Sequence, residues 1–367
     1  MSKIKRIIWL DIARTIAIIS ISSNHAINRA FLSDESVYDT FIHYPKPVSF
    51  LYAVIFVFSR VGVPLFLMIT GVLILNKEFE NQEDVKRFYK HNLLSIFITS
   101  EIWYFLMFWY RTILRANDIL AVGGIKYALI RCIETMLFIN QETMHNMWYI
   151  PMILCVYLLL PYVSIVLRKV GNEWLWIPIA IIVIEAMLVP NINHVLLING
   201  ISHEFRFGLE SANLFSPYLV FILMGYYIYC GLLKSLRDVA INLTAIFSFV
   251  ICVVYQYWEF SLPKGGKIAY DFMPLAVCSV FVFEVIRRYC DSDYQSRTIT
   301  YISRISFGIF FVHIFITSAL ARIAAFNSIN PILTFIILEV ISVGGSIVFI
   351  SLLSKVPIFK KYVFLIK

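Results

Sequence analysis

Charged side chains are scarce along this chain. Of its 367 residues only 15% are Asp, Glu, Lys or Arg, whereas 60% are hydrophobic. A typical soluble domain carries about 25% charged residues, most of them on its surface. The composition therefore excludes a soluble globule and indicates a protein that exposes much of its surface to lipid.

The motifs of the common soluble enzymes are also missing. The sequence has no GxSxG nucleophile elbow, no phosphate-binding loop, no HExxH zinc motif and no glycine-rich dinucleotide turn. Its histidines lack the spacing of metal ligands, and its six cysteines form no CxxC pair. We therefore expect no metal centre and interpret the cysteines as packing residues.

Long apolar runs recur from one end of the chain to the other. Runs of about 20 apolar residues are typical of helices that cross a bilayer. The sequence predicts an all-α fold, a polytopic transmembrane bundle that forms a single domain over residues 1–367. The ten predicted spans are residues 7–31, 49–75, 92–114, 147–167, 174–190, 214–233, 239–258, 271–287, 305–325 and 331–353.

The positive charges indicate an orientation. The net charge is +8, which in a membrane protein reflects cytoplasmic loops, so we expect no nucleic-acid partner. With the N-terminus in the cytoplasm, the inward segments hold most of the Lys and Arg residues. This asymmetry predicts that both termini are cytoplasmic. The outward loop 115–146 is itself basic, and residues 126–140 are predicted to form an amphipathic helix on the outer face.

The first span carries polar residues that a membrane helix normally excludes. Asp11, Arg14 and His25 interrupt an otherwise apolar run. Eleven residues separate Arg14 from His25, which is within ~20° of three helical turns and about 16 Å along the axis. The two side chains therefore share one face, and Asp11 is one turn before Arg14. A polar stripe through the membrane competes with a plainer interpretation, an Asp11–Arg14 pair near one surface and His25 at the other.

Other spans also contain polar residues. Arg60 and Pro64, with two nearby glycines, predict an irregular second span that lines a polar cavity, and the alternative is a kink with a snorkelling arginine. Taken alone, Trp148 is an interfacial anchor, and His313 fits a satisfied core hydrogen bond as well as catalysis. Four glutamates also lie within or beside spans, where any of them could pair with an arginine: Glu101, Glu185, Glu284 and Glu339.

Four ordered motifs resemble those of acyltransferase family 3, the integral-membrane O-acyltransferases that modify bacterial surface glycans. The first span has the family's Asp, Arg and His, and the second its Arg–x–x–Val–Pro–Leu–Phe pattern. The fourth resembles its His–x–Trp–Phe start, and the ninth its Ser–x–Gly–Ile–Tyr–x–x–His pattern. The matching residues are Asp11, Arg14, His25, Arg60, Val63, Pro64, Leu65, Phe66, Gly71, His145, Trp148, Ser306, Gly308, Ile309 and His313.

The chain departs from the family pattern at three places. Thr70 replaces a serine and keeps its hydroxyl, whereas Phe310 replaces a tyrosine and loses it. Asn92 and Ser95 stand where many members have Arg–x–x–Arg. If that arginine pair holds an anionic donor, then Lys86, Arg87 and Lys90 take its place here, or the donor is held differently.

The resemblance implies a reaction. Acetyl-CoA, or another short acyl-CoA, supplies an acyl group to a hydroxyl of a surface polysaccharide or lipid-linked glycan in the bacterial inner membrane. It implies three catalytic residues, with His25 as general base, Arg14 as a cationic partner and His313 in a supporting role. It implies five substrate-binding residues: Asp11, Asn24, Arg60, Thr70 and Trp148. An arginine or asparagine supplies the donor for the developing oxyanion.

Two other functions remain compatible with the residues themselves. A glycan or acyl-group transporter also needs charges inside the membrane and a broken helix. However, a transporter has no need of a base on the same helical face as Arg14. The membrane part of a sensory protein is a weaker alternative.

The charge asymmetry makes the topology testable. A phosphatase reporter fused after Lys367 is expected to be inactive, because it would stay in the cytoplasm, whereas a fluorescent protein fused there should mature. The same reporters inserted in the loop 115–146 provide the opposite control. An active phosphatase at the C-terminus would contradict the orientation and the expected outer position of His25.

Overall fold

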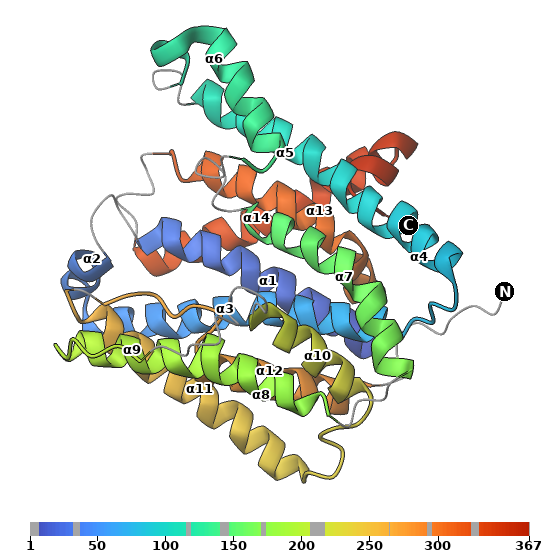
Figure 1. Cartoon of the computed structure of the whole chain (residues 1–367). Helices are drawn as coiled ribbons and strands as arrows, with labels where there is room; N and C mark the ends of the chain where they lie inside the picture. Colours follow the sequence, from blue (N-terminus) through green and yellow to red (C-terminus); the bar gives the residue numbers. More distant parts are fainter. Residues whose placement is uncertain are drawn as a thin grey trace. The chain divides into compact units, whose positions relative to one another are not determined.

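The regular secondary structure of the described residues is helical. The computed structural model describes residues 7–31, 37–114, 119–139, 147–169, 174–205, 217–263, 265–291, 296–323 and 330–366, and these contain helices and no strands (Figure 1). The all-α prediction is confirmed. This outcome follows from the solvent, because a helix satisfies its own backbone hydrogen bonds in lipid.

Each predicted span overlaps one or more of the helices, although several bounds differ. The helices are α1 (Ile8–Phe31), α2 (Val37–His43), α3 (Lys46–Leu75), α4 (Gln82–Phe88), α5 (Leu94–Leu114), α6 (Ile119–Met136), α7 (Tyr149–Lys169), α8 (Trp176–Val183), α9 (Val189–Ile198), α10 (Pro217–Tyr229), α11 (Asp238–Phe260), α12 (Met273–Cys290), α13 (Arg297–Leu320) and α14 (Pro331–Leu353). Wider π-helical turns at Tyr89–Leu93 and Ile184–Leu188 join α4 to α5 and α8 to α9. The helix predicted at 126–140 is α6, which begins and ends earlier.

Among the described residues, seven helical segments are long and apolar enough to cross a membrane. They are α3, α4–α5, α7, α8–α9, α11, α13 and α14. Three other helices do not meet these requirements. The polar residues of α1 lower its mean hydropathy, α12 contains a glutamate and two arginines, and α10 has only 13 residues. The number of crossings and the orientation of the termini therefore stay predictions.

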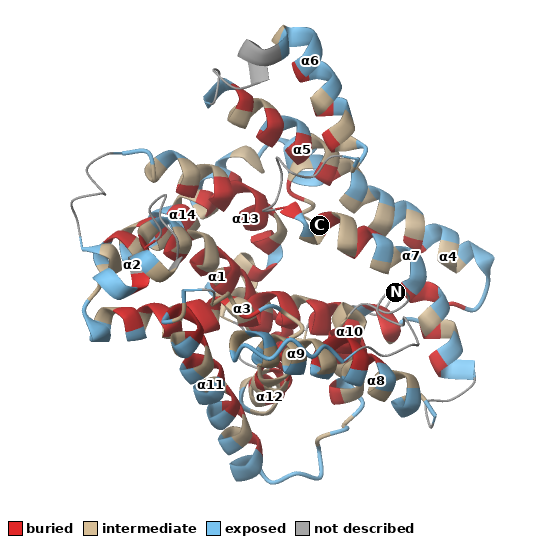
Figure 2. Ribbon diagram, turned by 60° about the vertical axis from the view of Figure 1, so that its left-hand side comes forward, coloured by how far each residue is buried: buried red, intermediate tan, exposed pale blue. Residues whose placement is uncertain are grey.

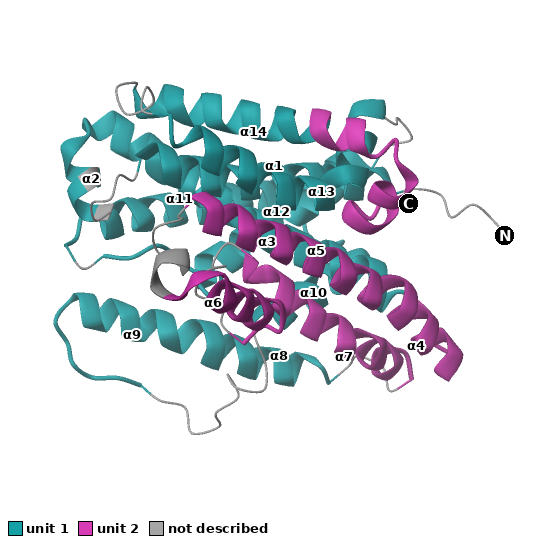
Figure 3. Ribbon diagram, turned by 90° about the horizontal axis from the view of Figure 1, so that it is seen from above, with its two compact units in different colours: residues 1–76, 170–347 teal, residues 77–169, 348–367 magenta. Residues whose placement is uncertain are grey.

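The chain forms two compact units, and each is described by itself. The first comprises residues 1–76 and 170–347, and the second comprises residues 77–169 and 348–367 (Figure 3). Every predicted site residue except Trp148 belongs to the first unit. The single-domain prediction remains open.

The first unit is built around α1 and α3. These two helices pack against each other, and α1 also packs on α13. Figure 2 shows buried residues along both helices, whereas α11 is exposed over much of its length. Small residues permit the close contact, because a Cβ on Gly62 would lie 2.6 Å from the Ala17 carbonyl oxygen. The Ser20 hydroxyl adds a hydrogen bond to the Phe58 carbonyl at 2.8 Å.

A second close contact joins α3 to α10. A Cβ on Gly71 would lie 1.9 Å from the Ile222 carbonyl oxygen, and one on Gly225 would lie 2.1 Å from that of Met68. Both distances are far below van der Waals contact. The two backbones therefore touch, as in the small-residue interfaces of membrane helices.

The expectation of an irregular second span is wrong. Helix α3 runs without interruption from Lys46 to Leu75, with Pro64 inside it. Pro64 removes only the bond to the carbonyl four residues earlier, and packing on both sides maintains the helix. The glycines that suggested a break serve instead as contact points for neighbouring helices.

The second unit is held by polar contacts to its own C-terminal segment. The Thr99 hydroxyl donates to the Tyr362 carbonyl at 2.7 Å, and the Trp103 indole donates to that of Val363 at 2.8 Å. At the other end of the unit, Arg168 pairs with Glu78 at 2.8 Å. The bonds from Thr99 and Trp103 fix the turn at Phe359–Val363 against α5.

The α3–α10 contact predicts a specific effect of added volume. Gly225→Ala should lower the free energy of unfolding by about 1–3 kcal/mol, because a methyl group would push the two backbones apart. Thermal melting of the detergent-solubilised protein measures this effect. Gly344→Ala on α14 is the matched control, since its Cβ would meet nothing within 4 Å. Equal melting temperatures for wild type and Gly225→Ala would contradict the packing described here.

Candidate functional site

A buried polar contact joins α13 to the first turn of α1. The Ser303 hydroxyl donates to Asp11 Oδ1 at 2.7 Å, and both side chains are buried. Thr15 lies one turn further along α1 and donates to the Asp11 carbonyl at 2.9 Å. A hydrogen bond to a carboxylate in an apolar interior is strong, so this contact sets the register of the two helices.

Two histidines face each other further along the same pair of helices. The ring centroids of His25 on α1 and His313 on α13 are 5.3 Å apart, with their planes at 47°. His313 is fully buried, whereas His25 is partly exposed. The structure thus brings together two of the three predicted catalytic residues, although they are 288 positions apart in the sequence.

The tautomer of His313 is defined by its surroundings. Its Nδ1 atom lies 2.7 Å from the Ile309 carbonyl oxygen. A carbonyl only accepts, so in the neutral ring Nδ1 carries the proton and Nε2 presents its lone pair. In the described part of the chain, Nε2 has no hydrogen-bond partner. The pair therefore includes an unused proton acceptor.

Arg14, the third predicted catalytic residue, lies on the same helix as His25. Because α1 is continuous from Ile8 to Phe31, the eleven-residue spacing places both side chains on one face as predicted. Arg14 is partly exposed and follows Asp11 by one turn.

Asn24, the residue before His25, connects α1 to α3. Its Oδ1 atom accepts from the Ser59 hydroxyl and from Asn28 Nδ2, each at 3.3 Å. Asn28 in turn accepts from Lys267 Nζ at 2.7 Å. A polar chain therefore runs from the residue beside His25 to a lysine in the loop between α11 and α12.

Arg60 lies near the end of this polar chain that carries Lys267. Its guanidinium carbon is 4.7 Å from the ring centre of Phe56 and 5.4 Å from that of Tyr270. Lys267 approaches the same Phe56 ring at 5.9 Å. Sequence reasoning identified Arg60 but missed Asn28 and Lys267, because only the fold returns that loop to α1.

The last two predicted site residues lie elsewhere. The Thr70 hydroxyl donates to the Phe66 carbonyl of its own helix at 2.9 Å, beside the α3–α10 contact. Trp148 is 36% exposed immediately before α7 in the second unit. Of the suggested donor-binding residues in that unit, Lys86 and Arg87 form ion pairs with Glu83 and Asp84. The roles proposed for these residues stay predictions.

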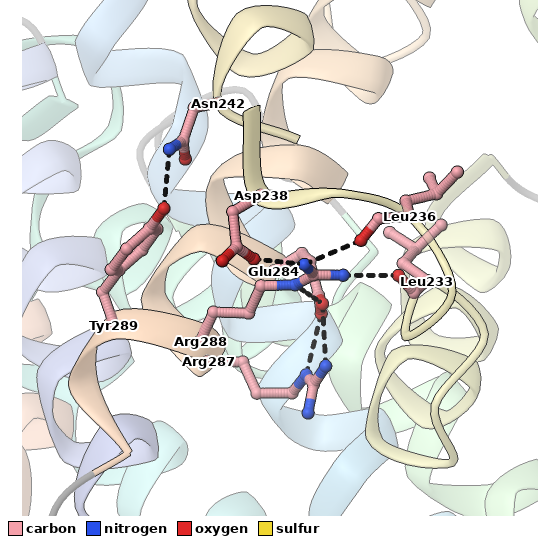
Figure 4. Close-up of polar contacts among 8 residues, drawn as sticks. All are labelled: Leu233, Leu236, Asp238, Asn242, Glu284, Arg287, Arg288 and Tyr289. Atoms are coloured by element: carbon pink, nitrogen blue, oxygen red, sulfur yellow. Dashed lines mark hydrogen bonds and ion pairs between the residues drawn. The ribbon is translucent and has the colours of Figure 1, made fainter. Parts of the chain in front are cut away.

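One cluster of charges is fully paired and structural. Glu284, which is fully buried, accepts from Arg287 at 2.7 Å and from Arg288 at 2.6 Å (Figure 4). Arg288 also binds Asp238 and the carbonyls of Leu233 and Leu236. One arginine thereby fastens the turn between α10 and α11 to α12, and the expected pairing of a span glutamate with arginine is confirmed for Glu284.

Comparison with known proteins gives one match. The family model described as an acyltransferase domain matches residues 7–351 and thus includes α1, α3 and α13 with their polar residues. Neither the curated proteins nor the solved structures contain a match to the chain.

The paired cluster predicts a large stability effect. Glu284→Gln should lower the free energy of unfolding by about 3–5 kcal/mol, because two guanidinium groups would lose their shared anion in a dry site. Chemical or thermal unfolding in detergent measures the loss. Glu83→Gln is the control, since its pair with Lys86 is exposed and should matter little. Equal stability of the two variants would show that Glu284 is not the anchor.

Proposed function

Because the chain belongs to acyltransferase family 3, whose model spans residues 7–351, we propose that it is a membrane O-acyltransferase. It moves an acetyl or other short acyl group from acyl-CoA to a hydroxyl of a cell-surface polysaccharide or lipid-linked glycan. The observation that carries this proposal is the pair formed by His25 and His313. The order and spacing of the motifs resemble those of the O-acetyltransferase of enterobacterial common antigen, which favours a glycan acceptor.

His25 acts as the general base. It removes the proton of the acceptor hydroxyl while that oxygen attacks the thioester carbonyl. The carbon–sulfur bond then breaks, the new ester forms, and the coenzyme A thiolate recovers the proton from the imidazolium. His25 suits this role because it is partly exposed, whereas His313 is enclosed.

His313 orients His25 and stabilises the charge that it acquires. Its fixed tautomer directs a lone pair away from the Ile309 carbonyl, and the neighbouring ring lies 5.3 Å away between centroids. Asp11 fixes the register of α1 with α13 through Ser303. A carboxylate–hydroxyl contact at one end of the helix pair therefore supports the histidine geometry at the other.

The remaining residues hold the substrates. Asn24 directly precedes His25 on α1 and supplies an N–H donor for the oxyanion of the tetrahedral intermediate. Arg14 lies about 16 Å away along the helix axis and adds a positive charge to the same helical face. Arg60 binds an anionic group of a substrate, and Thr70 and Trp148 are each proposed to contact a substrate. In the proposed orientation the donor arrives from the cytoplasm of a bacterium, at its inner membrane. The family assignment favours acyl transfer over a transporter that forms no bond.

The proposal is tested by substituting the base. His25→Gln should reduce acetyl transfer by about 10²–10⁴-fold, because a positioned base is lost while the side chain stays polar. The assay is release of coenzyme A from acetyl-CoA by purified protein, together with a mass gain on extracted glycan.

His91→Gln is the matched control, since His91 is exposed in the turn between α4 and α5. Near-normal turnover of a folded His25→Gln protein would exclude His25 as the base. His313 would then be the next histidine to substitute. If the wild type releases no coenzyme A with any short acyl-CoA, the proposed reaction itself is wrong.

A further inference from the structure

Two cations share one aromatic ring near the histidine pair. The Arg60 guanidinium lies over Phe56 at 4.7 Å, and Lys267 Nζ approaches the same ring at 5.9 Å. Both side chains are partly buried. Two like charges that converge in a desolvated place repel each other, so the arrangement costs free energy in the absence of a ligand.

Among the described residues, no carboxylate lies within ion-pair distance of either cation. Neither Arg60 nor Lys267 forms an ion pair in that part of the chain, and Arg60 Nε is buried without a hydrogen-bond partner. The cluster at Glu284 shows the opposite arrangement, in which two arginines converge on one carboxylate. Because uncompensated buried charge is costly, its retention points to a ligand of opposite charge.

The loop that carries Lys267 is firmly anchored. Glu259, buried at the end of α11, accepts from the Gly266 amide at 2.8 Å and faces His194 at 2.9 Å. The Gln256 side chain accepts from the Ile268 amide at 2.7 Å. These bonds to residues on both sides hold the Lys267 backbone in place, so its approach to Phe56 is a built feature and not the chance position of a surface lysine.

The chemistry of Lys267 agrees with this interpretation. Burial, and then the charge of Arg60, lower the pKa of its amine to about 8. The surroundings of Lys267 therefore disfavour its charged ammonium form. A bound anion would offset both effects and restore the protonated form.

We propose that Arg60 and Lys267 together bind an anionic substituent of a substrate, a phosphate or a carboxylate. This inference deepens the proposed function and depends on it for the identity of the substrates. The anion has two possible sources, the phosphates of the coenzyme A donor or an acidic group on the glycan acceptor. The polar chain through Asn28 and Asn24 places this group within a few side chains of His25.

The experiment measures binding rather than turnover. Isothermal calorimetry on the full-length protein in detergent compares desulfo-coenzyme A with pantetheine, which lacks the phosphates, and D-glucuronate with D-glucose, which lacks the carboxylate. Lys267→Gln keeps a donor toward Asn28 but removes the charge. It should weaken binding of the anionic probe by about tenfold or more, since a charge-assisted hydrogen bond is lost. Lys267→Arg should restore most of the affinity.

Lys361→Met is the matched control, because Lys361 also lies over an aromatic ring, that of Tyr362 at 4.8 Å. Weakening confined to desulfo-coenzyme A assigns the site to the donor, and weakening confined to glucuronate assigns it to the acceptor. Either result supports the site. Unchanged affinity of Lys267→Gln for every anionic probe would overturn it, as would a loss that Lys267→Arg does not restore.

Ligand-free melting separates the binding role from a structural one. If Lys267 serves a ligand, Lys267→Gln should melt at or above the wild-type temperature, because a repelled charge is gone. A lower melting temperature with intact anion binding would mean that the lysine only supports the loop, and would overturn the proposal. Intact anion binding by a wild type that transfers no acyl group would instead reject the proposed function and leave the site standing.

Discussion

The structure depends on one constraint, which is that polar groups inside apolar helices must find partners within the protein. Lipid offers no hydrogen bonds, so each buried charge is paired, neutralised or reserved for a ligand. Glu284 meets the constraint with two arginines, and Asp11 meets it with Ser303 across two helices. Glu259 meets it with a loop amide and His194. Once these groups are accounted for, the exceptions stand out. Among the described residues they include the Nε2 atom of His313, the Tyr52 hydroxyl and both carboxyl oxygens of Glu339, together with the cations Arg60 and Lys267, which form no ion pair there.

Close backbone packing is what allows so polar a helix as α1 to lie in the interior. Gly62 lets α3 approach α1 until Ala17 and Ser20 touch it, and Gly71 and Gly225 let α10 approach α3 from another side. Because these contacts involve backbone rather than flexible side chains, α1 has little freedom to rotate about its axis. The direction in which His25 and Asn24 point is therefore fixed by glycines on α3 and by the Asp11–Ser303 bond, and not by the site residues themselves.

Much of this arrangement could be predicted from the sequence, because it depends on local patterns. Apolar runs predicted the helices, and helical spacing placed Arg14 and His25 on one face of α1. What could not be predicted depends on contacts between distant segments. Asn28 and Lys267 are 239 positions apart, and no local signal shows that a loop after α11 returns to the end of α1. The prediction failed for α3 because Pro64 and its neighbouring glycines are ambiguous. The same residues mark a broken helix or a tightly packed one, and only the identity of the neighbouring helix decides between them.

The contrast between the two histidines argues for a division of labour. A base must reach the hydroxyl of an acceptor, and His313 is fully buried with one nitrogen committed to the Ile309 carbonyl. His25 is more exposed and lies on the helix that also carries Asn24 and the link to Lys267. An acceptor held by its acidic group at Lys267 would meet Asn28 first and then His25 and Asn24 along α1. His313 would then face the opposite side of the His25 ring, where its lone pair can stabilise the imidazolium as it forms. On this view the unpaired nitrogen of the buried histidine is retained because the charge that it serves exists only during the reaction.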